Sequence, residues 1–224
     1  MKSIFQIILT WSDVWALLLP MLVLWLNKKP PSYLKPIIFY LWIALFLNLF
    51  ADVIGDFRKP LHLPRELQSN NFLYNIHSIV RFMCFSTFFI RLQQPFLTVF
   101  KKIVPVLSLL FVLINFSFFE NFYNSGHLSG RLLATEAFLL LLYCLQYYLY
   151  QLREEELEFS REPHFWVATG LSIYVVINFF IFLFYVPMFD TNPKLADKMW
   201  DYHNIAYIIF CLFLAKAFYV PARR

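Results

Sequence analysis

The sequence is poor in charge, because only 15% of its 224 residues are Asp, Glu, Lys or Arg, against about 25% in soluble domains. Apolar residues make up 60% and aromatic residues 21%. The stretches between the apolar segments are short, so we expect no attached kinase, nucleotide-binding or receiver domain. No segment carries a motif that by itself identifies a catalytic activity or a cofactor.

Cysteine is also scarce. Cys84, Cys144 and Cys211 all lie within apolar segments, and no Cys-x-x-Cys spacing occurs. An odd number of cysteines in such segments argues against a disulfide framework. We therefore interpret the three thiols as small packing residues rather than as zinc ligands or redox groups.

Long apolar segments are what the chain has instead. A membrane-spanning helix needs about 20 predominantly apolar residues, and seven segments approach this length. They are Ile4 to Leu26, Leu34 to Ile54, Phe72 to Leu92, Thr98 to Phe119, Gly130 to Leu152, Phe165 to Phe189 and Trp200 to Val220. The first segment has no small-residue cleavage site and is read as a retained helix. We therefore predict an all-α polytopic membrane protein, a single domain of seven transmembrane helices.

The basic residues predict how this bundle is oriented, because cytoplasmic loops carry an excess of Lys and Arg. The amino-terminal side has seven: Lys2, Arg58, Lys59, Arg65, Arg131, Lys194 and Lys198. The opposite side has eleven: Lys28, Lys29, Lys35, Arg91, Lys101, Lys102, Arg153, Arg161, Lys216, Arg223 and Arg224. We therefore expect the amino terminus outside and the carboxyl terminus in the cytoplasm. The net charge of +5 is explained by anchoring to anionic lipid headgroups, and we expect no nucleic-acid partner.

Ionisable residues at membrane depth are the most informative, because each is costly in the bilayer and usually faces the bundle interior. They gather in the outer half of the predicted bundle: Asp13, Asp52, His77, Arg81, Glu136, Asp201 and His203, with Asn48, Asn178 and Asn204 at similar depth. Arg81 is expected to bond to one of the acids Glu136, Asp52 or Asp13. The set predicts an outward-opening polar pocket lined by His77, Arg81, Glu136, Asn178 and His203, with Asp52 near its rim.

The same residues have other interpretations. They could simply hold helices together, with the histidines in contact with water at the headgroup level. His77, His203 and Asp52 could instead bind a divalent metal such as zinc, with Glu136 as general base of an intramembrane lipid hydrolase. Seven-helix hydrolases such as alkaline ceramidases carry a His-x-x-x-His pair on the last helix, whereas here His203 is followed by Tyr207 at that spacing. A retinal Schiff base would need Lys216, which lies close to the cytoplasmic end, so retinal is not expected.

Several short motifs point to one group of proteins. They are Asn75-Ile-His-Ser78, Glu136 near the start of its helix, Phe165-Trp-Val-Ala-Thr-Gly170 with Tyr174, and Trp200-x-x-His-Asn204. With the order of segments, they resemble small uncharacterised seven-helix proteins common in Bacteroidota. That group often has a glutamate near the position of Arg81, so this chain departs from it there. The resemblance implies a location in the bacterial inner membrane.

These observations leave three functional hypotheses. The first is a binding or sensing protein whose outer pocket takes a small molecule or a lipid headgroup and informs a cytoplasmic partner. That partner would dock near residues 153–162, where five glutamates lie between two arginines. The second is the metal-dependent hydrolase. The third is a small-solute transporter, which the absence of a clear internal repeat disfavours.

Overall fold

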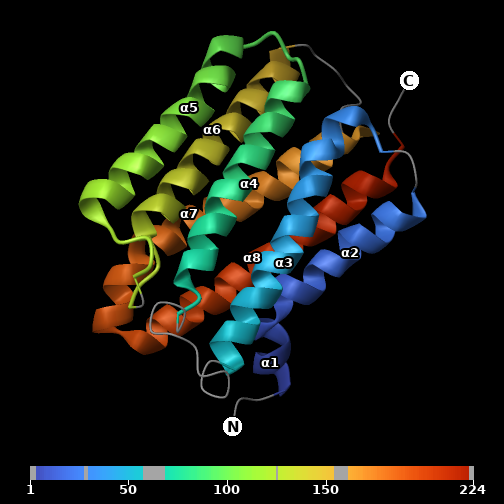
Figure 1. Ribbon diagram of the computed structural model, residues 1–224. Coiled ribbons are helices and arrows are strands. Elements are labelled where there is room, and N and C mark those ends of the chain that lie inside the picture. The colour runs from blue at the N-terminus through green and yellow to red at the C-terminus, as the bar shows by residue number, and fades with distance from the viewer. Residues whose placement is uncertain (1–3, 28–29, 58–68, 125, 154–160, 222–224) are drawn as a thin grey trace.

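The protein is all-helical in a computed structural model that describes residues 4–27, 30–57, 69–124, 126–153 and 161–221. The described residues form helices and turns but no strand (Figure 1). The helices are α1 (Ile4–Thr10), α2 (Ser12–Leu26), the 3₁₀ turn η1 (Ser32–Leu34), α3 (Lys35–Phe57), α4 (Asn71–Arg91), α5 (Thr98–Ile114) with the π-helical turn η3 (Asn115–Phe119), α6 (Gly130–Arg153), α7 (Pro163–Thr191) and α8 (Pro193–Tyr219).

Six helical segments in the described part of the chain are long and apolar enough to cross a membrane. They are residues 32–56, 71–91, 98–119, 130–153, 163–191 and 193–219. Each matches one of the predicted segments, so the chain has the make-up of an integral membrane protein. The predicted single helix from Ile4 to Leu26 is the exception.

That first segment is broken at Trp11, where the backbone leaves the α conformation (φ −89°, ψ 12°). The break leaves α2 with 15 residues, about 22 Å at 1.5 Å per residue against a hydrocarbon core of about 30 Å. The indole Nε1 of Trp11 donates to Asp56 Oδ2 at the end of α3 (3.2 Å). The interruption is therefore tied to the neighbouring helix, and it brings Ser12 and Asp13 into the protein interior.

The last two helices are longer than predicted and nearly continuous. The sequence predicts a loop between Phe189 and Trp200, but α7 ends at Thr191 and α8 begins at Pro193. Asn192 separates them and caps α8, because its Oδ1 accepts from the backbone N–H of Leu195 (3.2 Å). A proline follows at the first helical position, where its missing N–H costs nothing. The predicted loop is wrong here because capping chemistry outweighs the polar composition of the segment.

Helices α7 and α8 pack along each other, and α8 also packs against α2, while α4 lies between α3 and α6. Helix α5 lies at one side of the bundle, against α4 and α6 (Figure 1). It exposes apolar side chains such as Val99, Val106 and Leu113, as a lipid-facing helix does. One main core joins the helices and is rich in aromatic rings, including Phe85, Phe88, Phe89 and Phe210.

Candidate functional site

The centre of the polar cluster is an ion pair between α4 and α6. Arg81 donates from Nε to Glu136 Oε1 (2.5 Å) and from Nη2 to Glu136 Oε2 (2.7 Å). Ser78 Oγ also donates to Glu136 Oε2 (2.6 Å), and Arg81 Nη1 donates to the hydroxyl of Tyr174 on α7 (2.6 Å). Both charged side chains are buried. The expectation that Arg81 bonds to an acid is confirmed, and the acid is Glu136.

His77 belongs to a hydrogen-bonded chain that crosses several helices. Its Nε2 lies 3.2 Å from the hydroxyl of Tyr40 on α3, which lies 3.5 Å from the hydroxyl of Tyr207 on α8. Asn48 Nδ2 lies 3.4 Å from the same Tyr207 hydroxyl and donates to the backbone carbonyl of Asp13 (2.8 Å). The chain therefore connects α4 to the interrupted start of α2.

His203 on α8 is fixed by a second short network. Its Nδ1 lies 2.5 Å from Asn178 Oδ1, and Asn178 Nδ2 donates to the backbone carbonyl of Tyr174 (2.8 Å). The ring of His203 also lies against that of Trp200, with centroids 4.9 Å apart. A histidine bonded in this way has a defined orientation, which is a property of binding and relay residues as well as of structural ones.

These networks surround a small cavity, here called the core cavity. It is lined by Asp13, Asn48, Tyr74, His77, Arg81, Leu133, Tyr174, Phe182, Trp200, His203 and Tyr207. Its volume is about 20 Å³, which is room for about one water molecule. Three of the predicted pocket residues, His77, Arg81 and His203, therefore do meet at one space, but the space is too small for an organic ligand.

Two predicted lining residues do not line the core cavity. Glu136 faces Arg81 and Ser78, and both its oxygens are occupied by those groups. Asn178 is bonded to His203 behind the cavity wall. The sequence places Glu136 and Asn178 at the correct depth. Spacing along a helix does not show which polar side chain is already hydrogen-bonded to a neighbouring residue. A general base at Glu136 would first have to give up the bonds from Arg81.

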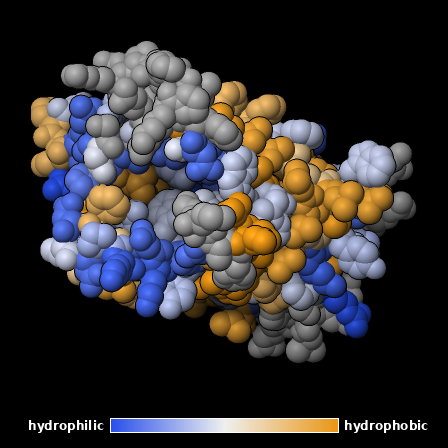
Figure 2. All heavy atoms as spheres, turned by 90° about the horizontal axis from the view of Figure 1, so that it is seen from below, coloured by the Kyte–Doolittle hydropathy of each residue, from blue (hydrophilic) through white to orange (hydrophobic). Residues whose placement is uncertain are grey.

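A larger cavity opens at the end of the bundle where α7 meets α8, and is here called the end cavity. Its volume is about 540 Å³, within the range of small-molecule sites. It is lined by Gln6, Thr10, Asp52, Gly55, Asp56, Ser69, Asn70, Asn71, Tyr74, Gly126, His127, Leu128, Tyr185, Val186, Phe189, Asp197, Trp200 and Asp201. Viewed from this end, hydrophilic side chains gather around a hollow on one side of the surface, and hydrophobic ones cover the other (Figure 2).

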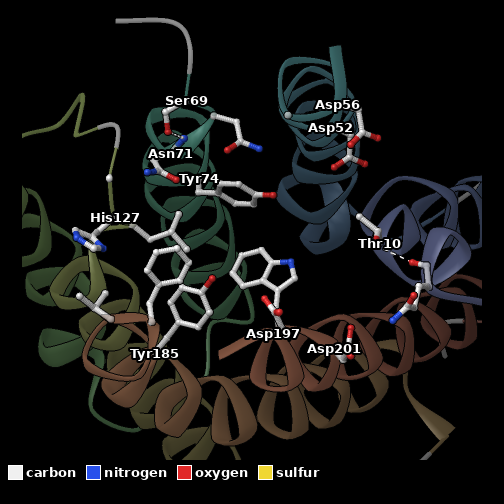
Figure 3. Close-up of a pocket in the computed structure, with 18 residues that line it drawn as sticks. Thr10, Asp52, Asp56, Ser69, Asn71, Tyr74, His127, Tyr185, Asp197 and Asp201 are labelled. Carbon is white, nitrogen blue, oxygen red and sulfur yellow. Dashed lines mark hydrogen bonds between the residues drawn. The ribbon is translucent and has the colours of Figure 1, made fainter. Parts of the chain in front are cut away.

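Four aspartates are among the described residues that line the end cavity. Asp52 and Asp56 on α3 face Asp197 and Asp201 on α8 from across the space (Figure 3). His127 also lines it, and none of the described lining residues is Lys or Arg. Asp52, predicted for the rim of the pocket, is the most buried of the four, with 9% of its surface exposed.

Two aromatic residues separate the end cavity from the core cavity, because Tyr74 and Trp200 line both. Their rings meet edge to face with centroids 5.5 Å apart, and Tyr185 packs on Trp200 at the same distance. Beside this partition, the side chain of Asp13 in the core cavity is hydrogen-bonded to that of Asp52 in the end cavity. The two carboxyl groups therefore connect the two spaces.

The residues predicted to bind zinc line two different cavities. His77 and His203 line the core cavity, whereas Asp52 lines the end cavity. Among the described residues, no group of three or more His, Cys, Asp or Glu side chains is arranged to hold an ion. The zinc site and the hydrolase stay predictions. Lys216 lies 5.4 Å from the ring centroids of Trp166 and Tyr219 near the opposite end of the bundle.

Comparisons of the chain with protein-family models, curated proteins and solved structures found no match. The two cavities are the features of the described structure that bear on function. Most of the acidic docking segment predicted near residues 153–162 lies outside the described residues.

Sequence reasoning missed most of the end cavity. Asp56 and Asp197 were assigned to loops, and His127 was not considered, because none of them interrupts an apolar run. Their signal is positional: all flank helix ends on the side of the bundle that carries the buried polar groups. Acidic residues at that side, taken together with Asp52, could have indicated the cavity.

Proposed function

We propose that this chain is an integral membrane binding or sensing protein whose end cavity takes a small molecule or lipid headgroup. The observation that carries the proposal is the end cavity itself, a polar space of about 540 Å³. It adjoins the core cavity, which is lined by the buried Arg81. Ligand sites combine such a space with a few convergent polar groups. A protein needing only stability gains little from either.

Seven transmembrane helices remain part of the proposal, with α1 and α2 together forming the first crossing. Helix α1 begins at the end of the bundle that holds the end cavity, and α8 ends at the other (Figure 1), as an odd number of crossings requires. With the excess of basic residues in the cytoplasm, the end cavity opens to the outside. A bacterial inner membrane is the proposed location.

Sensing requires that a ligand favours one packing of the helices over another. The end cavity is built from α1, α3, α4, α7 and α8. Tyr74 and Trp200, which separate it from the core cavity, line the core cavity together with Arg81. A ligand that moves Trp200 therefore acts on the contact between α4 and α8. The change in packing would reach a cytoplasmic partner through the ends of α4 and α8 that lie opposite the end cavity.

A stability screen tests the proposal. The purified protein in lipid nanodiscs would be heated with a panel of small amines, carboxylates, sugars and phosphorylated headgroups. A ligand at 100 times its dissociation constant stabilises the folded state by about 2.7 kcal/mol, so a rise in the unfolding temperature is expected for at least one class. The matched variant is Asp201→Trp, which fills the cavity from an exposed position and should abolish the rise. If no compound stabilises the wild type, the binding function is wrong.

A further inference from the structure

The chemistry of the end cavity narrows the ligand class, on the basis of the function proposed above. We propose that the end cavity binds a primary amine whose ammonium group passes Tyr74 and Trp200 to reach the carboxyl group of Asp13. The rest of the ligand would occupy the end cavity. Four observations lead to this assignment.

The first observation is the sign of the charge. Asp52, Asp56, Asp197 and Asp201 line the end cavity, and the described lining contains no Lys or Arg. A space in which carboxylates predominate among the described charged side chains concentrates ligands of the opposite charge. It also repels carboxylates and phosphates, so a free amine fits better than a phospholipid headgroup.

The second observation is an acceptor atom inside the core cavity. Asp13 lines this cavity with only 9% of its surface exposed, and its Oδ1 accepts no hydrogen bond within the described part of the chain. Most buried polar atoms in proteins have a hydrogen-bond partner. An ammonium group, which has three N–H donors, would provide one.

The third observation concerns a cation that lines the core cavity. Arg81 is part of this lining, but its Nε and Nη2 donate to Glu136 and its Nη1 donates to Tyr174. The guanidinium is therefore bonded elsewhere, which leaves Oδ1 of Asp13 to a ligand.

The fourth observation is the size of the core cavity. Its volume is about 20 Å³, enough for a group the size of water, which a primary ammonium is. A trimethylammonium group is several times larger and does not fit this volume. The rings of Tyr185 and Phe189 in the end cavity suit the apolar part of the ligand and also attract cations.

Titration calorimetry on the nanodisc-embedded protein tests the assignment with three matched probes. They are 2-phenylethylamine, its N,N,N-trimethyl derivative, and 3-phenylpropionate, which carries a carboxylate in place of the ammonium. We expect the primary amine to bind, the trimethyl compound to bind at least about tenfold more weakly, and the carboxylate not to bind. Equal affinity for both amines would overturn the path to Asp13, and binding of the carboxylate alone would overturn the cationic ligand.

Variants locate the amine. Asp13→Asn removes the negative charge but keeps the size, and it should weaken binding of 2-phenylethylamine at least about tenfold. Glu162→Gln makes the same chemical change at the opposite end of the bundle and should leave binding unchanged. Unaltered binding by a folded Asp13→Asn variant would overturn the proposal. If Asp13→Asn does not fold, the comparison of the three probes on the wild-type protein still tests whether a primary amine binds.

Failure of the amine is distinguishable from failure of the proposed function. If no amine binds but another class in the stability screen does, and Asp201→Trp blocks it, the end cavity remains a ligand site of different specificity. If no class binds at all, both proposals fall.

Discussion

At the scale of single residues, the ion pair of Arg81 and Glu136 is the main polar contact inside the bundle. It joins α4 to α6 with two direct hydrogen bonds, and the bond from Arg81 to the hydroxyl of Tyr174 connects α7 to them. A buried pair of this kind contributes little net stability when intact, but removing one partner leaves the other charged in an apolar environment. The arrangement therefore serves mainly to fix which faces of the three helices meet.

Removing one member of this pair should destabilise the protein strongly. Glu136→Gln and Arg81→Met each leave a buried charge or its donors unpaired, so we expect a loss of about 3–5 kcal/mol. The double variant should recover much of this, because no uncompensated charge remains. Thermal unfolding in nanodiscs measures both. Arg131→Ala is the control, because the Arg131–Glu120 contact is long (3.9 Å) and partly exposed, and such pairs contribute at most about 1 kcal/mol.

The sequence could predict that Arg81 has an acidic partner but not which one. Depth in the membrane limits the acids to Glu136, Asp52 and Asp13, and the cost of a lone guanidinium requires one of them. The choice depends on how α4 is rotated relative to α2, α3 and α6, which apolar periodicity defines only loosely. Asp13 and Asp52 contact each other instead, a pairing of like groups that charge complementarity would not predict.

At the scale of helices, the close contact of α7 and α8 depends on a glycine. A Cβ built on Gly170 would lie 2.4 Å from Phe213 Cβ, well inside normal contact. Small residues let transmembrane helices approach closely and so gain packing energy. Helix α8 also carries Trp200 and His203, which line the core cavity.

Enlarging Gly170 should therefore loosen the bundle. We expect Gly170→Ala to lower stability by about 1–3 kcal/mol, the cost of overpacking, with Gly170→Val worse. The matched control is Gly126→Ala, whose added Cβ would meet Asn124 Oδ1 at an ordinary 3.4 Å. If both alanine variants unfold at the wild-type temperature, the α7–α8 contact is not as tight as described.

Helix existence was predictable from composition, but the break in the first segment was not. Six apolar segments become long helices because nothing else satisfies backbone groups in hydrocarbon. The break at Trp11 is tied to a bond to Asp56 that forms only after the two helices have met, so the local sequence does not reveal it. The cap at Asn192 is local, because its Oδ1 accepts from the N–H of Leu195, and Asn followed by Pro is a helix-start signal that could have been read from the sequence.

At the scale of the whole molecule, Asp13, Asp52 and His203 lie towards the end of the bundle that holds the end cavity. Lys101 and Gln146 are buried towards the other end, beside the aromatic core. The predicted single pocket is in fact two spaces, separated by Tyr74 and Trp200. Depth and charge predicted the polar end, whereas the size of each space depends on how the aromatic rings pack. The central claim is that the larger space opens to the outside of the cell.

Labelling with a membrane-impermeant maleimide tests this claim most directly. The three native cysteines are buried, so a cysteine introduced at Asp201, on the wall of the end cavity, or at exposed Tyr219, at the other end of α8, provides the signal. The account predicts that Asp201→Cys is labelled on intact cells and that Tyr219→Cys is labelled only after the membrane is permeabilised. Labelling of Tyr219→Cys but not Asp201→Cys on intact cells would contradict it, because the end cavity would then face the cytoplasm.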